Sequence, residues 1–170
     1  MPVIAALVAV LLSTGADAPA PRVSFGAGPL LGSLYGLRIV GGSARAGVAV
    51  AELYPEESRA RFAVEIGAAL DVGDTPERLR LTRIAGSALV RATALGRVRA
   101  SAGMGLELGQ LWLATATGGS QVALVLGPRV VLGVELGRLG RATPFVEAHG
   151  AASLGGASLH AASLLAGVRL

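Results

Sequence analysis

Apolar side chains recur at every second position along most of this chain. From Val122 to Leu136 the even positions are apolar, whereas Arg129 and Glu135 occupy odd positions. A β-strand points successive side chains to opposite faces of its sheet, so a period of two gives one apolar and one polar face. The segment is therefore predicted to be a strand.

Three other segments alternate in the same way, namely residues 59–72, 99–113 and 159–170. In the first of them the even positions from Phe62 to Val72 are all apolar. The second has one face rich in glycine, which a helix would tolerate badly because glycine weakens helices. All three are predicted to be strands.

Four further segments alternate less clearly because alanine and glycine blur the contrast between the two faces. They are residues 22–30, 37–53, 81–95 and 142–154. An alanine-rich helix stays an alternative for residues 81–95. With these segments counted as strands, the chain has about eight.

The spacing of these strands favours a barrel that crosses a membrane. Tilted strands need about 9 to 11 alternating residues to cross a bilayer, and small barrels of this kind contain eight strands. Hydrophobic residues make up 52% of the chain and the mean hydropathy is +0.63, yet no long apolar run follows the first dozen residues. The predicted fold class is all-β, a closed antiparallel up-and-down transmembrane β-barrel.

Two prolines fall inside predicted strands of this closed barrel. Pro128 and Pro144 cannot donate a hydrogen bond to a neighbouring strand, so each needs a bulge or a strand end. We expect a local irregularity at Pro128.

The connections between the predicted strands alternate in character. Residues 54–59, 96–98 and 137–141 are predicted to be short periplasmic turns. The opposite, external end is expected to carry four short loops near residues 32–36, 71–80, 114–121 and 155–158.

The first residues of the chain resemble a secretory signal. An apolar run from Val3 to Leu12 precedes a small and polar stretch that contains the A-x-A pattern of cleavage sites. Cleavage is expected after Ala18, with Ala16 as the alternative because Pro19 follows Ala18 directly. The predicted organisation is a signal peptide over residues 1–18 and a barrel domain over residues 19–170, and the alternative for the apolar run is a buried core helix.

If the apolar faces meet lipid, the opposite faces turn polar side chains into the barrel. An eight-stranded barrel is only wide enough to be filled by side chains, so the charges inside it must pair with one another and no open pore is expected. The carboxylates at 65, 107, 135 and 147 are expected to pair with the arginines at 45, 91, 129 and 169. The predicted interior network consists of Arg45, Glu65, Arg83, Arg91, Glu107, Arg129, Glu135, Glu147, His149 and Arg169.

The few aromatic residues fall near predicted strand ends, where membrane barrels place aromatics at the interfaces. The predicted interface aromatics are Tyr35 and Trp112 at the external end and Tyr54, Phe62 and Phe145 at the periplasmic end.

Composition excludes several classes of function. The chain has no Cys, which removes disulfides, thiolate metal sites and cysteine nucleophiles. The formal net charge is +4, but the arginines form no run and have no interleaved aromatics for base stacking, so nucleic acid is not expected as a partner. No cofactor site, metal site or catalytic site is predicted.

Two small groups of residues are candidate sites. Glu147, His149 and Ser153 share one face of a predicted strand and could serve an esterase that acts on lipid, although an interior polar role for His149 is favoured. His160 is expected to be a surface residue at a strand end. Asp71, Asp74 and Glu77 could attract a divalent cation, but a solvated loop is the favoured reading.

The last predicted strand alternates from Ala162 through Leu164, Ala166 and Val168 to Leu170. In this pattern, and in its overall alternation, the chain resembles the eight-stranded outer-membrane barrels typified by the OmpA transmembrane domain. The resemblance implies the outer membrane of a Gram-negative bacterium, contact with its lipids, a monomer, and recognition of the last strand by the assembly machinery. Leu170 departs from the terminal aromatic of that family.

The favoured function is therefore that of an integral outer-membrane barrel with a structural or surface role and no enzymatic activity. A lipid A-modifying enzyme and a soluble lipocalin-like barrel that binds an apolar ligand are the alternatives. A soluble carrier would turn its apolar face inward, and about nine charges on the other face could not line a lipid pocket comfortably. The short loops argue against an adhesin or receptor.

Overall fold

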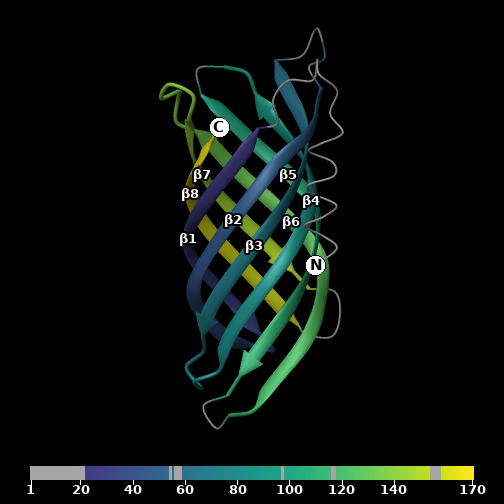
Figure 1. Ribbon diagram of the computed structural model, residues 1–170, viewed down its shortest axis with the longest axis vertical. Helices are drawn as coiled ribbons and strands as arrows, with labels where there is room; N and C mark the ends of the chain where they lie inside the picture. Colours follow the sequence, from purple (N-terminus) through teal and green to yellow (C-terminus); the bar gives the residue numbers. More distant parts are fainter. Residues whose placement is uncertain (1–21, 54, 56–58, 97, 116–117, 154–157) are drawn as a thin grey trace.

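The computed structural model is a closed barrel of eight antiparallel strands, each paired with the next along the chain (Figure 1). It describes residues 22–170 except 54, 56–58, 97, 116–117 and 154–157, so the predicted signal segment 1–18 lies outside the described residues. The predicted all-β fold class is confirmed. The strands are β1 (Val23–Leu34), β2 (Leu37–Leu53), β3 (Ala60–Asp74), β4 (Arg80–Ala94), β5 (Arg99–Ala114), β6 (Ser120–Glu135), β7 (Thr143–Ala152) and β8 (Leu159–Arg169).

The register of the strand pairs sets the tilt of the wall. A path through paired residues, once around the barrel from Val130, passes Leu31 and Asp74 and returns to β6 at Ser120. The path therefore closes ten residues away from its start on the same strand. Eight strands close into a barrel only with a stagger and tilt of this kind, and Figure 1 shows the strands running obliquely around the axis.

All four weakly alternating segments are strands. β4 pairs along nearly its whole length with β3 on one side and β5 on the other. The helical alternative for residues 81–95 is therefore wrong, because pairing with two neighbours outweighs the helix propensity of alanine. Among the described residues, no helix has the length and hydropathy that crossing a bilayer requires.

The strand prolines lie where pairing stops on one side. The β1–β8 pairs are interrupted at Pro29, the β6–β7 pairs begin at Arg129, directly after Pro128, and Pro144 lies just beyond the last β6–β7 pair. The β5–β6 register passes Pro128 without a break. The irregularity expected at Pro128 is thus the end of the β6–β7 pairing and not a bulge. Because β7 does not pair with β6 at this position, no carbonyl of β7 is left waiting for the N–H that proline lacks.

The register shift in this wall lies in β2 instead. Ala49 pairs with Glu65 and Ala51 pairs with the preceding residue of β3, so Val50 is an extra residue. A bulge of this kind reverses which positions face inward beyond it. Glu52 consequently points into the barrel although it shares the parity of outward residues earlier in β2.

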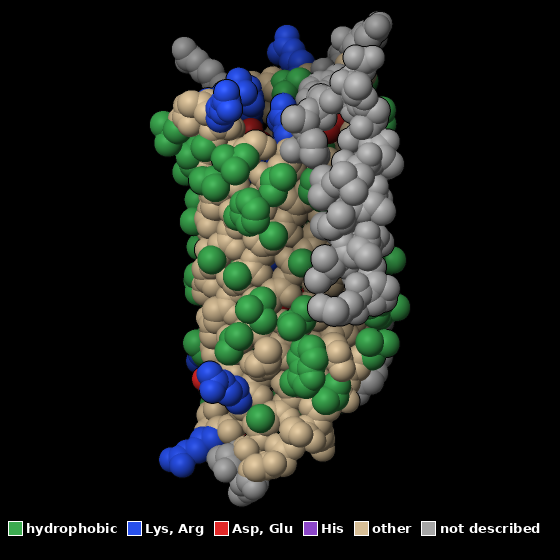
Figure 2. Space-filling view, viewed as in Figure 1, with side chains coloured by type: hydrophobic (Ala, Val, Ile, Leu, Met, Phe, Trp, Pro, Cys, Tyr) green, Lys and Arg blue, Asp and Glu red, His purple; other side chains and the backbone are tan. Residues whose placement is uncertain are grey.

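The outer face of the wall is apolar, and Figure 2 shows green side chains spread over the visible part of it. The outward positions include Met104, which is 70% exposed, and Leu132, which is 63% exposed. An apolar surface this extensive does not face water in soluble monomers. Val64, Met104, Leu106, Leu124, Leu132 and Leu164, all on the apolar faces of the alternating segments, are exposed, and Ile66 lies on the same face but is half-buried.

Charged side chains are scarce on this outer face. Among the described strand residues, Arg38, Asp74 and Arg80 are the only arginines or carboxylates on outward positions. All three lie within one or two residues of a strand end on the same side of the barrel. Between the two rims the outward positions of the described strands carry no charge.

The two ends of the barrel differ. We call the end with Val23 and Arg169 the terminal end, and the opposite end, with the β1–β2 hairpin, the distal end. Tyr35 and Gly36 turn that hairpin with φ angles of 50° and 85°, the left-handed pair that a two-residue hairpin requires. The other distal connections join β3 to β4, β5 to β6 and β7 to β8. The expected loops at 32–36 and 71–80 are shorter in the structure than the sequence predicted. Strand structure takes up 32–34 and 71–74.

Candidate functional site

The distal part of the barrel interior is filled by apolar side chains. They come from six strands and are almost completely buried, and Leu111 is 0% exposed. Because they close the bore with hydrocarbon, we call this group the apolar plug. Its members are Leu30, Leu34, Ile39, Leu81, Leu111, Val125 and Leu159.

Below the apolar plug, four neighbouring strands, β2 to β5, contribute a cluster of paired charges. The Nε atom of Arg83 donates to Oδ2 of Asp71 over 2.7 Å. The carboxylate of Glu107 lies 2.8 Å from the guanidinium of Arg45 and 2.7 Å from that of Arg83. One carboxylate therefore bridges two arginines, from β2 and β4. All four side chains are almost fully buried, where an unpaired charge would be costly.

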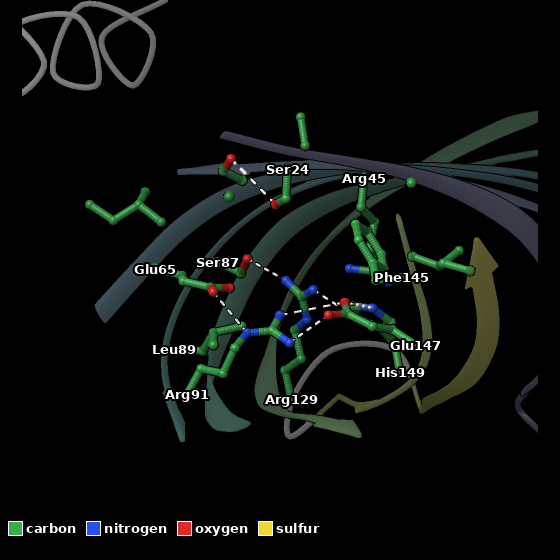
Figure 3. A pocket seen from close by; sticks show the side chains of 16 residues that line it. Ser24, Arg45, Glu65, Ser87, Leu89, Arg91, Arg129, Phe145, Glu147 and His149 are labelled. Carbon is green, nitrogen blue, oxygen red and sulfur yellow. Dashed lines mark hydrogen bonds and ion pairs between the residues drawn. The ribbon is translucent and has the colours of Figure 1, made fainter. Parts of the chain in front are cut away.

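Deeper in the barrel, Arg91 gathers several partners (Figure 3). Its Nε atom lies 2.8 Å from Glu65, and its Nη1 atom lies 2.5 Å from Glu147 and 3.1 Å from the hydroxyl of Ser101. The neighbouring Arg129 donates to the hydroxyl of Ser87. The cluster ties β3, β4, β5, β6 and β7 together through the barrel interior.

His149 links two members of this cluster. Its Nδ1 atom lies 2.8 Å from Arg129, and its Nε2 atom lies 2.9 Å from Glu147. A guanidinium group can only donate hydrogen bonds, so Nδ1 accepts one from Arg129. Nε2 therefore carries the ring proton and donates a hydrogen bond to the carboxylate of Glu147. Both ring nitrogens are therefore occupied, and neither is free to act as the base for a serine nucleophile.

The terminal part of the interior contains the remaining charges. Arg169 lies 2.6 Å from Glu135 and also contacts Glu147. Its guanidinium carbon stacks over the ring of Phe145 at 4.8 Å from the centroid, a cation–π contact. Arg61 approaches Glu135 at 3.5 Å and the bulge-directed Glu52 at 3.9 Å.

The described interior is close to electrically neutral. Six arginines and six carboxylates are enclosed in it, because the structure adds three charged residues to the ten predicted ones. A seventh arginine, Arg99, pairs with Glu135 from the terminal rim, where its side chain is 42% exposed. A cavity among Glu65, Arg91, Arg129 and Glu147 has a volume of only about 30 Å³, room for about two water molecules. The interior is thus filled, in keeping with the narrow bore of an eight-stranded barrel. The added residues are Glu52, Arg61 and Asp71.

The structure brings all ten residues of the predicted network into the barrel. Each is buried or half-buried there and makes an ion pair or hydrogen bond with another member, with Asp71 or with an interior serine. Arg61 and Asp71 share the parity of Glu65, so the alternation itself could have added them. Glu52 had no such signal, because the bulge at Val50 shifts its parity.

The interface aromatics need one correction. Phe145 is 4% exposed and points into the barrel beneath Arg169, because it shares the parity of Glu147 and not that of the outer wall. Phe62 is exposed on the outer face near the terminal end, and Tyr35 is exposed in the distal hairpin. Trp112 is half-buried on an outward position near the distal end, and Tyr54 lies outside the described residues.

The fold separates the three acidic residues that were candidates for binding a divalent cation. Asp71 is 1% exposed and pairs with Arg83 inside the barrel. Asp74 and Glu77 are exposed at the distal rim. Among the described residues no group of three or more His, Cys, Asp or Glu side chains is placed to hold a metal ion. His160 is exposed on an outward position at the start of β8.

The fold resembles those of known outer-membrane barrels, although no protein family profile and no curated protein matches the chain in sequence. Neisserial surface protein A is similar in structure with a TM-score of 0.60 and 18% identity, over 88% of this chain and 96% of that one. Ail, the attachment invasion locus protein of Yersinia pestis, is similar with a TM-score of 0.54 and 11% identity, over 88% of this chain and 97% of that one. The resemblance to small eight-stranded outer-membrane barrels is thereby confirmed at the level of the fold.

Proposed function

We propose that this protein is an integral protein of a bacterial outer membrane, with a structural or surface role and without enzymatic activity. The observation that carries the proposal is the outer wall, which is apolar between the rims and, among the described strand residues, carries arginines and a carboxylate only at the distal end. Such a wall is stable in lipid and would be a large exposed patch in water. The fold and its structural neighbours support the same location.

The contents of the interior weigh against the other classes of function. A soluble carrier of an apolar ligand needs an apolar cavity, whereas this interior contains paired charges and a cavity of about 30 Å³. A pore needs an open bore, and the apolar plug fills the distal part of it. An esterase needs a free base, and both nitrogens of His149 are engaged.

The orientation and partners follow from the proposed location. The terminal end faces the periplasm and the distal end faces outward, as in barrels with both ends of the chain on the periplasmic side. Residues 1–18 direct export and are removed after Ala16 or Ala18. The barrel is a monomer surrounded by outer-membrane lipids. The assembly machinery recognises the alternating β8 strand and the Leu170 that follows it.

Cell fractionation combined with gel mobility tests this proposal. We expect the protein in the outer-membrane fraction, with a band that migrates differently before and after boiling, as folded barrels do. Reconstituted protein is expected to produce no ion-conducting steps in a planar bilayer. Recovery in a soluble fraction would overturn the location, and stable conductance would overturn the closed interior.

A further inference from the structure

Two arginines on the outer wall stand apart from all other strand arginines. Every other arginine in the described strands has a carboxylate oxygen at 3.9 Å or less. Among the described residues, Arg38 and Arg80 have no ion pair and no side-chain hydrogen bond. These two are also the only strand arginines that point outward.

Their positions place the two cations on one side of the distal rim. Arg80 on β4 is paired in register with Asp74, the last residue of β3, and Arg38 lies two residues before the β2 partner of Asp74. Neighbouring strands lie about 4.8 Å apart, so the two arginines stand on strands separated by roughly 10 Å. Val40 and Ile84 lie below them on the wall and are about half exposed.

The wall therefore presents cations above an apolar surface at the height where lipid headgroups begin. We propose that Arg38 and Arg80 bind the phosphate group of an anionic lipid in the outer leaflet, with its acyl chains against the wall below. Guanidinium groups bind phosphate with paired, charge-assisted hydrogen bonds, and basic residues at a membrane surface attract anionic lipids. The inference rests on the proposed outer-membrane location.

Neighbouring charges make this a local site and not a broad basic patch. The exposed Arg78 lies in the adjoining β3–β4 loop, with a φ of 62°, and adds a third cation. Asp74 and Glu77 offset two of the three positive charges. A weakly charged rim attracts few anions without specific contacts, so binding should depend on the individual arginines.

Native mass spectrometry of the full chain in detergent micelles tests the site, with bisphosphorylated lipid A and its dephosphorylated form as the probes. The variants are Arg38→Gln and Arg80→Gln, each alone. The matched control is Arg138→Gln with Arg141→Gln, since both arginines are exposed in the loop at the terminal end. Gel mobility before and after boiling reports whether each sample is a folded barrel.

We expect each rim variant to bind phosphorylated lipid A about fivefold more weakly, the change that corresponds to about 1 kcal/mol for one arginine. The control should bind like the wild type, and the dephosphorylated lipid should not distinguish the proteins. Equal binding by folded rim variants would overturn the lipid site alone, as would displacement of the lipid by inorganic phosphate. A wild-type chain that shows no folded barrel would instead overturn the proposed function.

Discussion

Arg45 and Glu107 are 62 residues apart in the chain, yet Nη1 of the arginine lies 2.8 Å from Oε2 of the glutamate. Arg45 is on β2 and Glu107 is on β5, two strands that share no edge. The ion pair therefore crosses the barrel interior and joins opposite parts of the wall. Contacts of this kind fill a bore that is too narrow for a channel.

Removing one charge from this pair should destabilise the barrel strongly. Glu107→Gln leaves Arg45 and Arg83 without their shared carboxylate, and breaking a buried pair costs about 3 to 5 kcal/mol. The double variant Arg45→Met with Glu107→Gln should recover part of the loss, because fewer charges are stranded. Urea unfolding in lipid vesicles measures both, and a single variant as stable as the wild type would show that these groups face water.

A charge placed on the outer wall should be costly in a way that depends on depth. Leu132 lies near the middle of the wall and points outward, so Leu132→Arg should cost about 2 to 4 kcal/mol in lipid vesicles. Val122 is also exposed but lies near the distal rim, and Val122→Arg should cost about 0 to 1 kcal/mol. Equal costs at the two positions would contradict the placement of the barrel in the bilayer.

The apolar plug should behave as a packed core. Leu111 is fully buried in it, and Leu111→Ala should lower the free energy of unfolding by about 2 to 5 kcal/mol through lost contacts and a cavity. Leu108→Ala is the matched control, because Leu108 is exposed on the outer face of the same strand. Unfolding in vesicles should separate the two variants clearly, and a larger loss for Leu108→Ala would reverse the assignment of faces.

His149 should hold a single proton at a defined ring nitrogen. Its Nδ1 atom faces a donor on Arg129, so the proton is expected on Nε2, which faces Glu147. Nitrogen NMR of the imidazole ring in detergent distinguishes the two neutral forms. A protonated Nδ1 would contradict the hydrogen-bonded chain through this residue.

The pattern of the sequence predicted the faces of the wall because side-chain direction in a strand depends only on parity. The same rule places Glu147 and His149 inside. It also places Phe145 inside, but the expectation that aromatics lie at the interface was given more weight there. Parity failed only where the register shifts, so Glu52 was missed beyond the bulge at Val50.

Two other features were not predicted from the sequence. Leu111 and Val125 share the parity of Glu107 and Arg129, so the alternation places them inside the barrel, but their residue types alone do not mark an apolar plug because lipid and a packed core select the same side chains. The partners inside the barrel depend on which strands face each other across the bore. Which strands face each other is set by the stagger of the closed wall. The spacing of Arg91 and Glu147 in the chain therefore does not reveal that they form an ion pair.

The central claim, that the wall faces lipid and the interior is closed, is tested most directly by adjacent residues of β8. Leu164 points outward and is 54% exposed, whereas Ser163 is 5% exposed and points inward. Because the chain has no Cys, Leu164→Cys and Ser163→Cys each provide one thiol for a small bimane label. In vesicles the account predicts that the thiol at 164 is labelled and its fluorescence is quenched by lipids with brominated chains, while the thiol at 163 stays unreactive until unfolding. Rapid labelling at 163 together with protection at 164 would contradict it.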